Sequence, residues 1–142
     1  MDSDRRIPAL SIDGANLIVD WWGEWIEFHD FHILTVPPLD AVSGEMRIHA
    51  WRINWEQLDE QGHVTNHGHC LITFLFREIQ SFAYGSEVVP APPAIIGSLA
   101  VTPHEGGGWL IEWETSYGMD GWIHAEDVSI QLEPGRPEGT PW

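Results

Sequence analysis

The chain has 142 residues and a formal net charge of −16, because 22 Asp and Glu face only 6 basic residues, all of them arginine. This length is typical of one domain, and a hydrophobic fraction of 43% is too high for a disordered acidic chain. The negative charge repels phosphate and argues against a nucleic-acid partner. We expect a single domain over residues 1–142, with its core at about 13–133 and a Pro/Gly-rich tail at 134–142.

The residue types also exclude several chemistries. Without lysine the chain cannot form a Schiff base or a P-loop. Cys70 is the single cysteine, so an intrachain disulfide and a cysteine-based zinc site are excluded. The N-terminal residues lack the apolar core of a signal peptide, and no apolar run reaches the roughly 20 residues of a membrane span. These features predict a cytoplasmic protein without a membrane partner.

The segment 13–23 favours a short N-terminal helix. Its apolar residues recur at spacings of three and four, and Gly23 is suited to end the helix in the left-handed conformation. The alternative is a hairpin turn at Asp13-Gly14, a dipeptide that hairpins also favour. The periodicity favours the helix.

Strand patterns fill the rest of the chain. The expected strands are residues 28–36, 45–55, 70–77, 95–102, 109–114 and 123–132. The run Cys70–Arg77 is apolar on both faces and should be central, whereas in 109–114 Trp109, Ile111 and Trp113 should point inward and Glu112 and Glu114 outward. Residues 56–68 are polar and glycine-punctuated, which predicts a long loop, and the prolines of 85–94 predict a crossing connector.

The expected fold class is therefore mainly β: an antiparallel sheet or sandwich with one short N-terminal helix. An α+β arrangement is the alternative.

The densest group of chemically useful side chains is His29, Asp30 and His32. Histidine with carboxylate suits zinc binding or acid–base catalysis, and a metal-dependent hydrolase built on these three residues is one possible function. On a strand, however, His29 and His32 point to opposite faces. We favour a structural role, in which His29 and Asp30 form a buried or partly buried pair, and we expect no metal and no cofactor.

The other histidines match no metal motif. His63, His67 and His69 surround the glycine-containing loop, where a divalent metal is conceivable but the spacing is unspecific. His49, His104 and His124 are isolated in the sequence and are expected to be surface or hydrogen-bonded residues.

Tryptophan is unusually abundant, with nine residues. Indoles fill cores, but they also stack on sugars and anchor protein interfaces. Trp21, Trp22 and Trp25 crowd one short element that cannot easily bury them all, so this group is the favoured functional one. A carbohydrate-binding β domain is therefore a second possible function.

The block Trp25–Ile33 resembles the bacterial Immunity protein 50 family, whose members typically carry Gly-x-Trp-Pro-Ser-Phe-His-Asp-Ala-Glu-Val. The matching positions are Gly23, Trp25, Phe28, His29 and Asp30. The chain departs from the pattern at Ile26-Glu27 and Phe31-His32, and the resemblance extends loosely over about residues 13–133. It implies a non-enzymatic immunity protein of a polymorphic toxin system, which binds and blocks a cognate toxin and supplies no catalytic residues.

The charge is compatible with that function, because an acidic face can mask a basic toxin surface. The expected partner-binding carboxylates are Asp59 and Glu60, in the predicted loop, and Glu112 and Glu114, on the solvent face of a half-buried strand. We rank a toxin-neutralising binding protein first, ahead of the carbohydrate-binding domain and the hydrolase.

Overall fold

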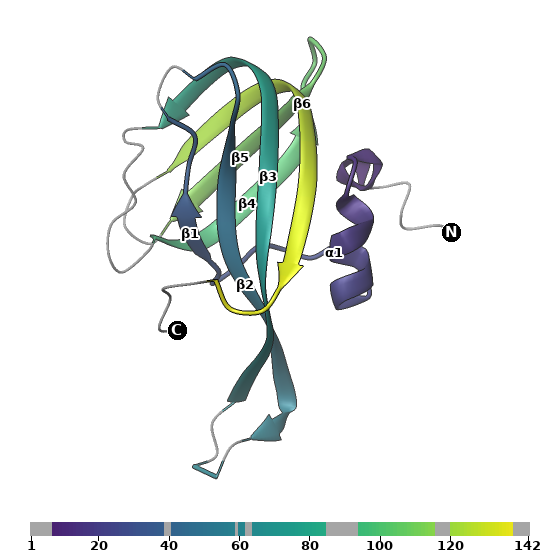
Figure 1. Cartoon of the computed structure of the whole chain (residues 1–142), viewed down its shortest axis with the longest axis vertical. Coiled ribbons are helices and arrows are strands. Elements are labelled where there is room, and N and C mark those ends of the chain that lie inside the picture. Colours follow the sequence, from purple (N-terminus) through teal and green to yellow (C-terminus); the bar gives the residue numbers. More distant parts are fainter. Residues whose placement is uncertain are drawn as a thin grey trace.

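The computed structural model describes residues 7–38, 41–58, 60–61, 64–84, 94–115 and 120–137. Within these ranges, six antiparallel strands close into a barrel in the order β1-β2-β3-β6-β5-β4, and one short helix, α1, lies outside it (Figure 1). The strands are β1 (His32–Thr35), β2 (Gly44–Leu58), β3 (Val64–Tyr84), β4 (Ala94–Pro103), β5 (Trp109–Thr115) and β6 (Gly121–Pro134). The predicted mainly β, antiparallel fold is confirmed, and its sheet takes a closed form.

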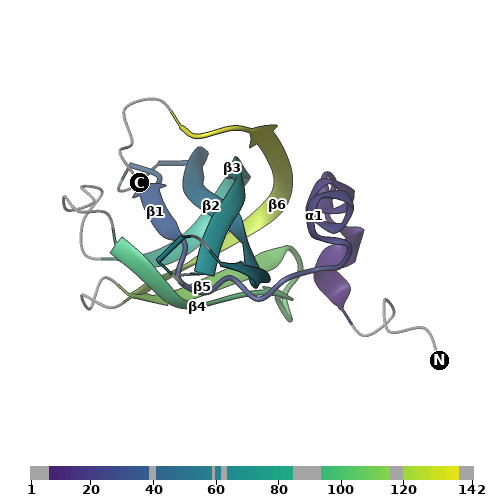
Figure 2. The same cartoon turned by 90° about the horizontal axis from the view of Figure 1, so that it is seen from below.

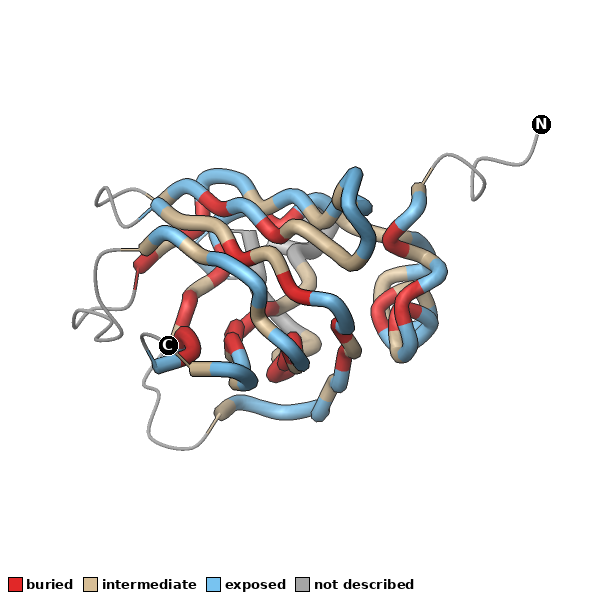
Figure 3. The backbone as a smooth tube through the Cα atoms, turned by 90° about the horizontal axis from the view of Figure 1, so that it is seen from above, coloured by how far each residue is buried: buried red, intermediate tan, exposed pale blue. Residues whose placement is uncertain are grey.

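β3 is not an edge strand, as predicted, although closure of the barrel gives every strand two neighbours. It pairs with β2 along one edge and with β6 along the other. The side chains of Cys70, Ile72, Phe74 and Phe76 are buried, and so are those of Leu71 and Thr73 between them. Elsewhere in the barrel, buried and exposed positions alternate along the strands, as a half-solvated sheet requires (Figure 3).

The prediction of a long loop at 56–68 is largely wrong. Beyond Ala50, β2 and β3 continue as a paired arm, with Arg52 opposite His67 and Leu58 opposite Val64. The arm projects from the lower end of the barrel in Figure 1. Polar residues can form it because cross-strand backbone hydrogen bonds do not require an apolar face. Residues 59, 62 and 63 at its turn lie outside the described residues.

The N-terminal helix is confirmed as α1 (Ala15–Trp22), preceded by a 3-10 turn, η2 (Pro8–Ser11). Gly23 ends α1 in the left-handed conformation, as predicted, and the alternative hairpin at Asp13-Gly14 does not form. The helix docks beside β6, where the backbone N–H of Ile130 donates to the carbonyl of Asp13 at 2.8 Å (Figure 2). Gly14 has a φ of 90°, and a Cβ there would overlap the carbonyl oxygen of Ile130.

β1 begins at His32, later than the predicted start at Phe28. The reason is Asp30, whose φ of 66° is left-handed and breaks the extended chain. The preceding irregular segment crosses the lower end of the barrel (Figure 2). Phe28 is buried there and packs against Phe74, with ring centroids 5.7 Å apart.

The C-terminal half matches its predicted strands closely. In β5, Ile111 and Trp113 are buried and Glu112 and Glu114 are exposed, as the alternation predicts, while Trp109 is half-buried. After β6 the chain turns back across β3, where the N–H of Gly135 donates to the carbonyl of His69 at 2.7 Å. Most of the predicted connector (85–93), the β5–β6 turn (116–119) and the end of the tail (138–142) lie outside the described residues.

In the described part of the chain, no helix is both long and apolar enough to cross a membrane.

Candidate functional site

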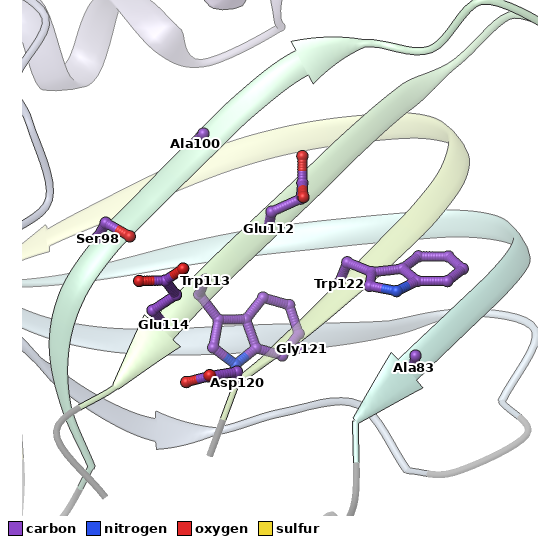
Figure 4. Close-up of a pocket in the computed structure, with 9 residues that line it drawn as sticks. All are labelled: Ala83, Ser98, Ala100, Glu112, Trp113, Glu114, Asp120, Gly121 and Trp122. Atoms are coloured by element: carbon purple, nitrogen blue, oxygen red, sulfur yellow. The ribbon is translucent and has the colours of Figure 1, made fainter. Parts of the chain in front are cut away.

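The outer face of β4, β5 and β6 carries a hollow of about 530 Å³, which we call the acidic hollow (Figure 4). The strand register produces it. Glu112 lies between Ala100 on β4 and Trp122 on β6, and Glu114 lies beside Ser98. Small side chains on one flank and a large indole on the other leave a depression. Its lining consists of Ala83, Ser98, Ala100, Glu112, Trp113, Glu114, Asp120, Gly121 and Trp122.

The lining is strongly negative. Glu112, Glu114 and Asp120 are all exposed, and none of the nine lining residues is basic. Asp120 is held in place because its Oδ1 accepts a hydrogen bond from the backbone N–H of Thr115 at 2.9 Å. Trp122 is half-buried, so part of its ring is available for contact. Carboxylates around an indole suit a cationic side chain, through ion pairing and cation–π attraction.

Gly121 lies in the lining of the acidic hollow, at a point where neighbouring atoms leave no room for a side chain. A Cβ at this position would lie 2.6 Å from Cζ2 of Trp113 and 2.9 Å from the carbonyl oxygen of Ala83. The absence of a side chain lets the indole of Trp113 pack beneath β6, where it is 3% exposed. Tyr84 packs on the same indole, with ring centroids 5.9 Å apart.

The structure brings together two of the four predicted partner-binding carboxylates. Glu112 and Glu114 both line the acidic hollow. Glu60 is exposed at the tip of the β2–β3 arm, apart from that face, and Asp59 lies outside the described residues. No local pattern in the sequence indicates Asp120 or Trp122, because the pairing of β5 with β6 places Trp122 beside Glu112 and the hydrogen bond from Thr115 places Asp120.

The His29–Asp30 pair exists, but the prediction that it is buried or partly buried is wrong. Nδ1 of His29 lies 2.9 Å from Oδ2 of Asp30, and the two side chains are 65% and 61% exposed. The left-handed backbone at Asp30 precedes β1 and leaves the pair at the surface. His32 lies elsewhere, among the rings of His49 and Trp51. The three residues proposed for a hydrolase therefore do not converge.

His32 instead belongs to a cluster with His49, His69 and Trp51 on β1, β2 and β3, which we call the histidine cluster. Nε2 of His49 lies 3.0 Å from Nδ1 of His69, and the Trp51 ring packs against all three imidazoles. The expectation that His49 is a surface or hydrogen-bonded residue is confirmed by this hydrogen bond, and the neighbouring strand supplies a partner that is distant in sequence. His67 has no described side chain, and His63 lies outside the described residues.

The environment of His49 disfavours its charged form. Burial lowers the pKa of His49 to about 4, with further lowering by the positive charges of His69, His32 and Arg136. Burial also lowers the pKa of His32. Among the described residues, no group of three or more His, Cys, Asp or Glu has an arrangement that could hold a metal ion.

His104 and His124 are hydrogen-bonded residues, as expected. Their rings stack with centroids 3.6 Å apart. Nδ1 of His104 accepts from the N–H of Gly106 at 3.1 Å, and Nε2 of His124 lies 2.9 Å from the carbonyl oxygen of Gly107. These contacts hold the β4–β5 turn against β6.

The N-terminal tryptophans divide between structural and exposed roles. Nε1 of Trp21 donates to the carbonyl of Gly68 at 3.1 Å, and the Arg52 guanidinium lies 4.9 Å from the Trp21 ring centre. These contacts tie α1 to the base of the β2–β3 arm. Trp22 and Trp25 are half-buried and border a second hollow, beside the His29–Asp30 pair.

The fold and its acidic hollow thus define a small, closed antiparallel barrel with a negatively charged recess on one face. No family model, curated protein or solved structure matches the chain.

Proposed function

We propose that this protein is a non-enzymatic immunity protein that binds a cognate bacterial toxin in the cytoplasm and blocks it, and that the toxin presents a basic surface. The observation that carries the proposal is the acidic hollow, in which three carboxylates and an indole share one recess without a basic residue. A protruding Lys or Arg of a partner protein suits such a recess in both charge and shape.

The distribution of charge supports a protein partner. Glu112, Glu114 and Asp120 make no ion pair with an arginine of this chain in the described part of the structure, so their field is not cancelled locally. The net charge of −16 adds long-range attraction for a basic protein. Because exposed charges contribute more to the rate of encounter than to final affinity, we expect fast, salt-sensitive association.

The resemblance to the Immunity protein 50 family supports the part of the proposal that names the protein as an immunity protein and its partner as a toxin. Of its matching positions, Gly23 ends α1, while Trp25 and Phe28 pack edge to face with ring centroids 5.9 Å apart. The role of these three residues in helix termination and ring packing explains why they agree with the family pattern. His29 and Asp30 are exposed and leave a polar pair available for contact with a partner.

A carbohydrate-binding function is the second candidate, and the half-buried indoles in the two hollows favour it. Tryptophan faces stack on sugar rings, but sugar sites do not require three uncompensated carboxylates. The acidic hollow is better matched to a cation, and we therefore rank the protein partner first.

The test is co-expression with the product of the gene immediately upstream, which we expect to encode the toxin. We expect cells that produce the toxin to survive when they also produce this protein. The double variant Glu112→Lys/Glu114→Lys should protect poorly. Asp13→Lys/Asp20→Lys is a matched control, because it makes the same charge change at exposed positions beside and within α1.

The proposal is supported if Glu112→Lys/Glu114→Lys loses protection while its stability is unchanged, and if Asp13→Lys/Asp20→Lys still protects. Absence of protection by the unmodified protein would contradict the immunity function. Equal protection by both double variants would contradict the choice of the acidic hollow as the contact surface.

A further inference from the structure

A second hollow, of about 560 Å³, lies between the end of α1, the irregular segment that leads to β1, and Trp51 of β2. We call it the aromatic hollow. Its lining consists of Trp22, Glu24, Trp25, Ile26, Glu27, His29, Asp30, Phe31 and Trp51. The lining therefore includes the exposed residues of the block Trp25–Ile33, which resembles the family pattern, and two of the three N-terminal tryptophans, Trp22 and Trp25.

Core packing holds the indoles of the aromatic hollow in place. Trp22 and Trp51 both contact the buried ring of Phe31, with centroids 6.1 and 5.5 Å away. Trp25 packs edge to face on Phe28. All three indoles nevertheless remain half-buried, so each is anchored at one side and open at another. A rigid aromatic surface of this kind binds ligands at little cost in side-chain entropy.

The polar part of the lining is almost entirely anionic. Glu24, Glu27 and Asp30 are exposed, and no arginine lines the hollow. The backbone at Asp30 is fixed, because its N–H donates to the carbonyl of Ile96 at 2.8 Å. The contact with Nδ1 of His29 involves one oxygen of the Asp30 carboxylate, Oδ2, and the Asp30 side chain is 61% exposed.

Indole faces together with carboxylates recognise a planar cation best. A guanidinium group stacks on an indole and forms paired hydrogen bonds to carboxylate oxygens, whereas an ammonium group is compact and strongly hydrated. The anionic lining and the net charge of −16 complement the basic partner inferred above. We infer that the aromatic hollow receives an arginine side chain of that partner, an assignment that rests on the proposed function.

The experiment follows the indole N–H resonances of the intact protein by NMR during titration with the blocked tripeptide Gly-Arg-Gly. The same peptide with citrulline is the control for charge, because citrulline has nearly the shape of arginine but is neutral. A lysine peptide is the control for the planar group. We expect saturable shifts for Trp22, Trp25 or Trp51 with the arginine peptide, weaker binding of the lysine peptide, and no saturable shifts with citrulline.

Two matched triple variants locate the binding. Glu24→Gln/Glu27→Gln/Asp30→Asn removes three exposed carboxylates from the aromatic hollow, and asparagine tolerates the left-handed backbone of Asp30. It should weaken arginine binding about tenfold. Glu112→Gln/Glu114→Gln/Asp120→Asn makes the same charge change in the acidic hollow and should leave these resonance shifts unchanged.

Equal shifts with citrulline and arginine, equal binding of the lysine peptide, or shifts confined to Trp122 would overturn the assignment. If these indoles responded to cellohexaose and not to the arginine peptide, the assignment would also be overturned, because the hollow would then be a sugar site.

Failure of this assignment can be distinguished from failure of the proposed function. Arginine binding with no protection against the toxin removes the immunity function alone, whereas protection without arginine binding removes only the assignment of this hollow.

Discussion

His49 and His69 are joined ring to ring, with Nε2 of His49 3.0 Å from Nδ1 of His69. One nitrogen must donate and the other accept, so the contact requires at least one neutral imidazole. His49 is fully buried, and its Nδ1 has no hydrogen-bond partner in the described part of the chain. The contacts of the histidine cluster therefore favour uncharged imidazoles, which predominate at neutral rather than acidic pH.

The first prediction concerns pH. Burial, followed by the charges of His69, His32 and Arg136, lowers the pKa of His49 to about 4 from 6.5, so between these values the unfolded chain binds a proton that the folded chain does not. The contribution of His49 to stability should be complete above about pH 6.5 and lost as the pH falls to about 4. Its size is at most about 3 kcal/mol, since one pKa unit corresponds to about 1.4 kcal/mol.

Urea unfolding followed by tryptophan fluorescence, at several pH values from 7.5 to 4.5, measures this effect. His49→Gln should flatten the dependence of the unfolding free energy on pH. His29→Gln removes an exposed histidine, whose only contact of this kind in the described chain is with the exposed Asp30, and should change the dependence far less than His49→Gln does. All carboxylates other than Asp30 keep the same surroundings in these proteins, so their titration cancels in the comparison. A His49→Gln protein that keeps the full wild-type slope would rule out this role of His49.

The second prediction compares two glycines of similar backbone conformation. Gly14 and Gly23 have φ values of 90° and 87°, but only at Gly14 would a Cβ meet the backbone of Ile130. Gly23→Ala should cost about 1 kcal/mol for the left-handed conformation alone. Gly14→Ala should cost more than about 2 kcal/mol, because it also pushes α1 away from β6. Chemical denaturation of the two variants provides the measurement, and equal costs would show that α1 does not dock closely on β6.

The third prediction concerns Cys70. Burial raises the pKa of its thiol to about 12, although Arg52 acts weakly in the opposite direction. Because the thiolate is the reactive form, the native protein should resist maleimide at neutral pH and react only after unfolding in denaturant. Mass spectrometry of samples taken over time distinguishes the two states. Rapid modification of the native protein would show that β3 is not the protected centre of the barrel.

Local patterns predicted a substantial part of this fold. The spacing of Leu17, Ile18 and Trp21 predicted α1, because helical periodicity is a property of one short segment. The apolar run at Cys70–Phe76 predicted the central strand, and the alternation around Glu112 predicted an outward acidic row. In each case the pattern that predicts the structure lies entirely within one short segment of the chain.

The features that the sequence analysis missed depend on pairing between distant segments. Closure of the barrel requires His32 to pair with Ile95, and no local pattern specifies that contact. The same is true of His49 with His69, and of Trp122 beside Glu112. The exposure of the His29–Asp30 pair was missed because a single left-handed residue, Asp30, ends the apparent strand pattern.

The central claim is the proposal that the acidic hollow binds a basic toxin. Calorimetric titration of this protein with the product of the gene immediately upstream, which we expect to be the toxin, tests this claim most directly. We predict a saturable complex whose affinity falls as salt rises, because the screening length is only about 8 Å at physiological ionic strength. Glu112→Lys/Glu114→Lys should weaken the complex at least about tenfold, and Asp13→Lys/Asp20→Lys should change it little. Absence of binding, or equal affinities for the two variants, would contradict the claim.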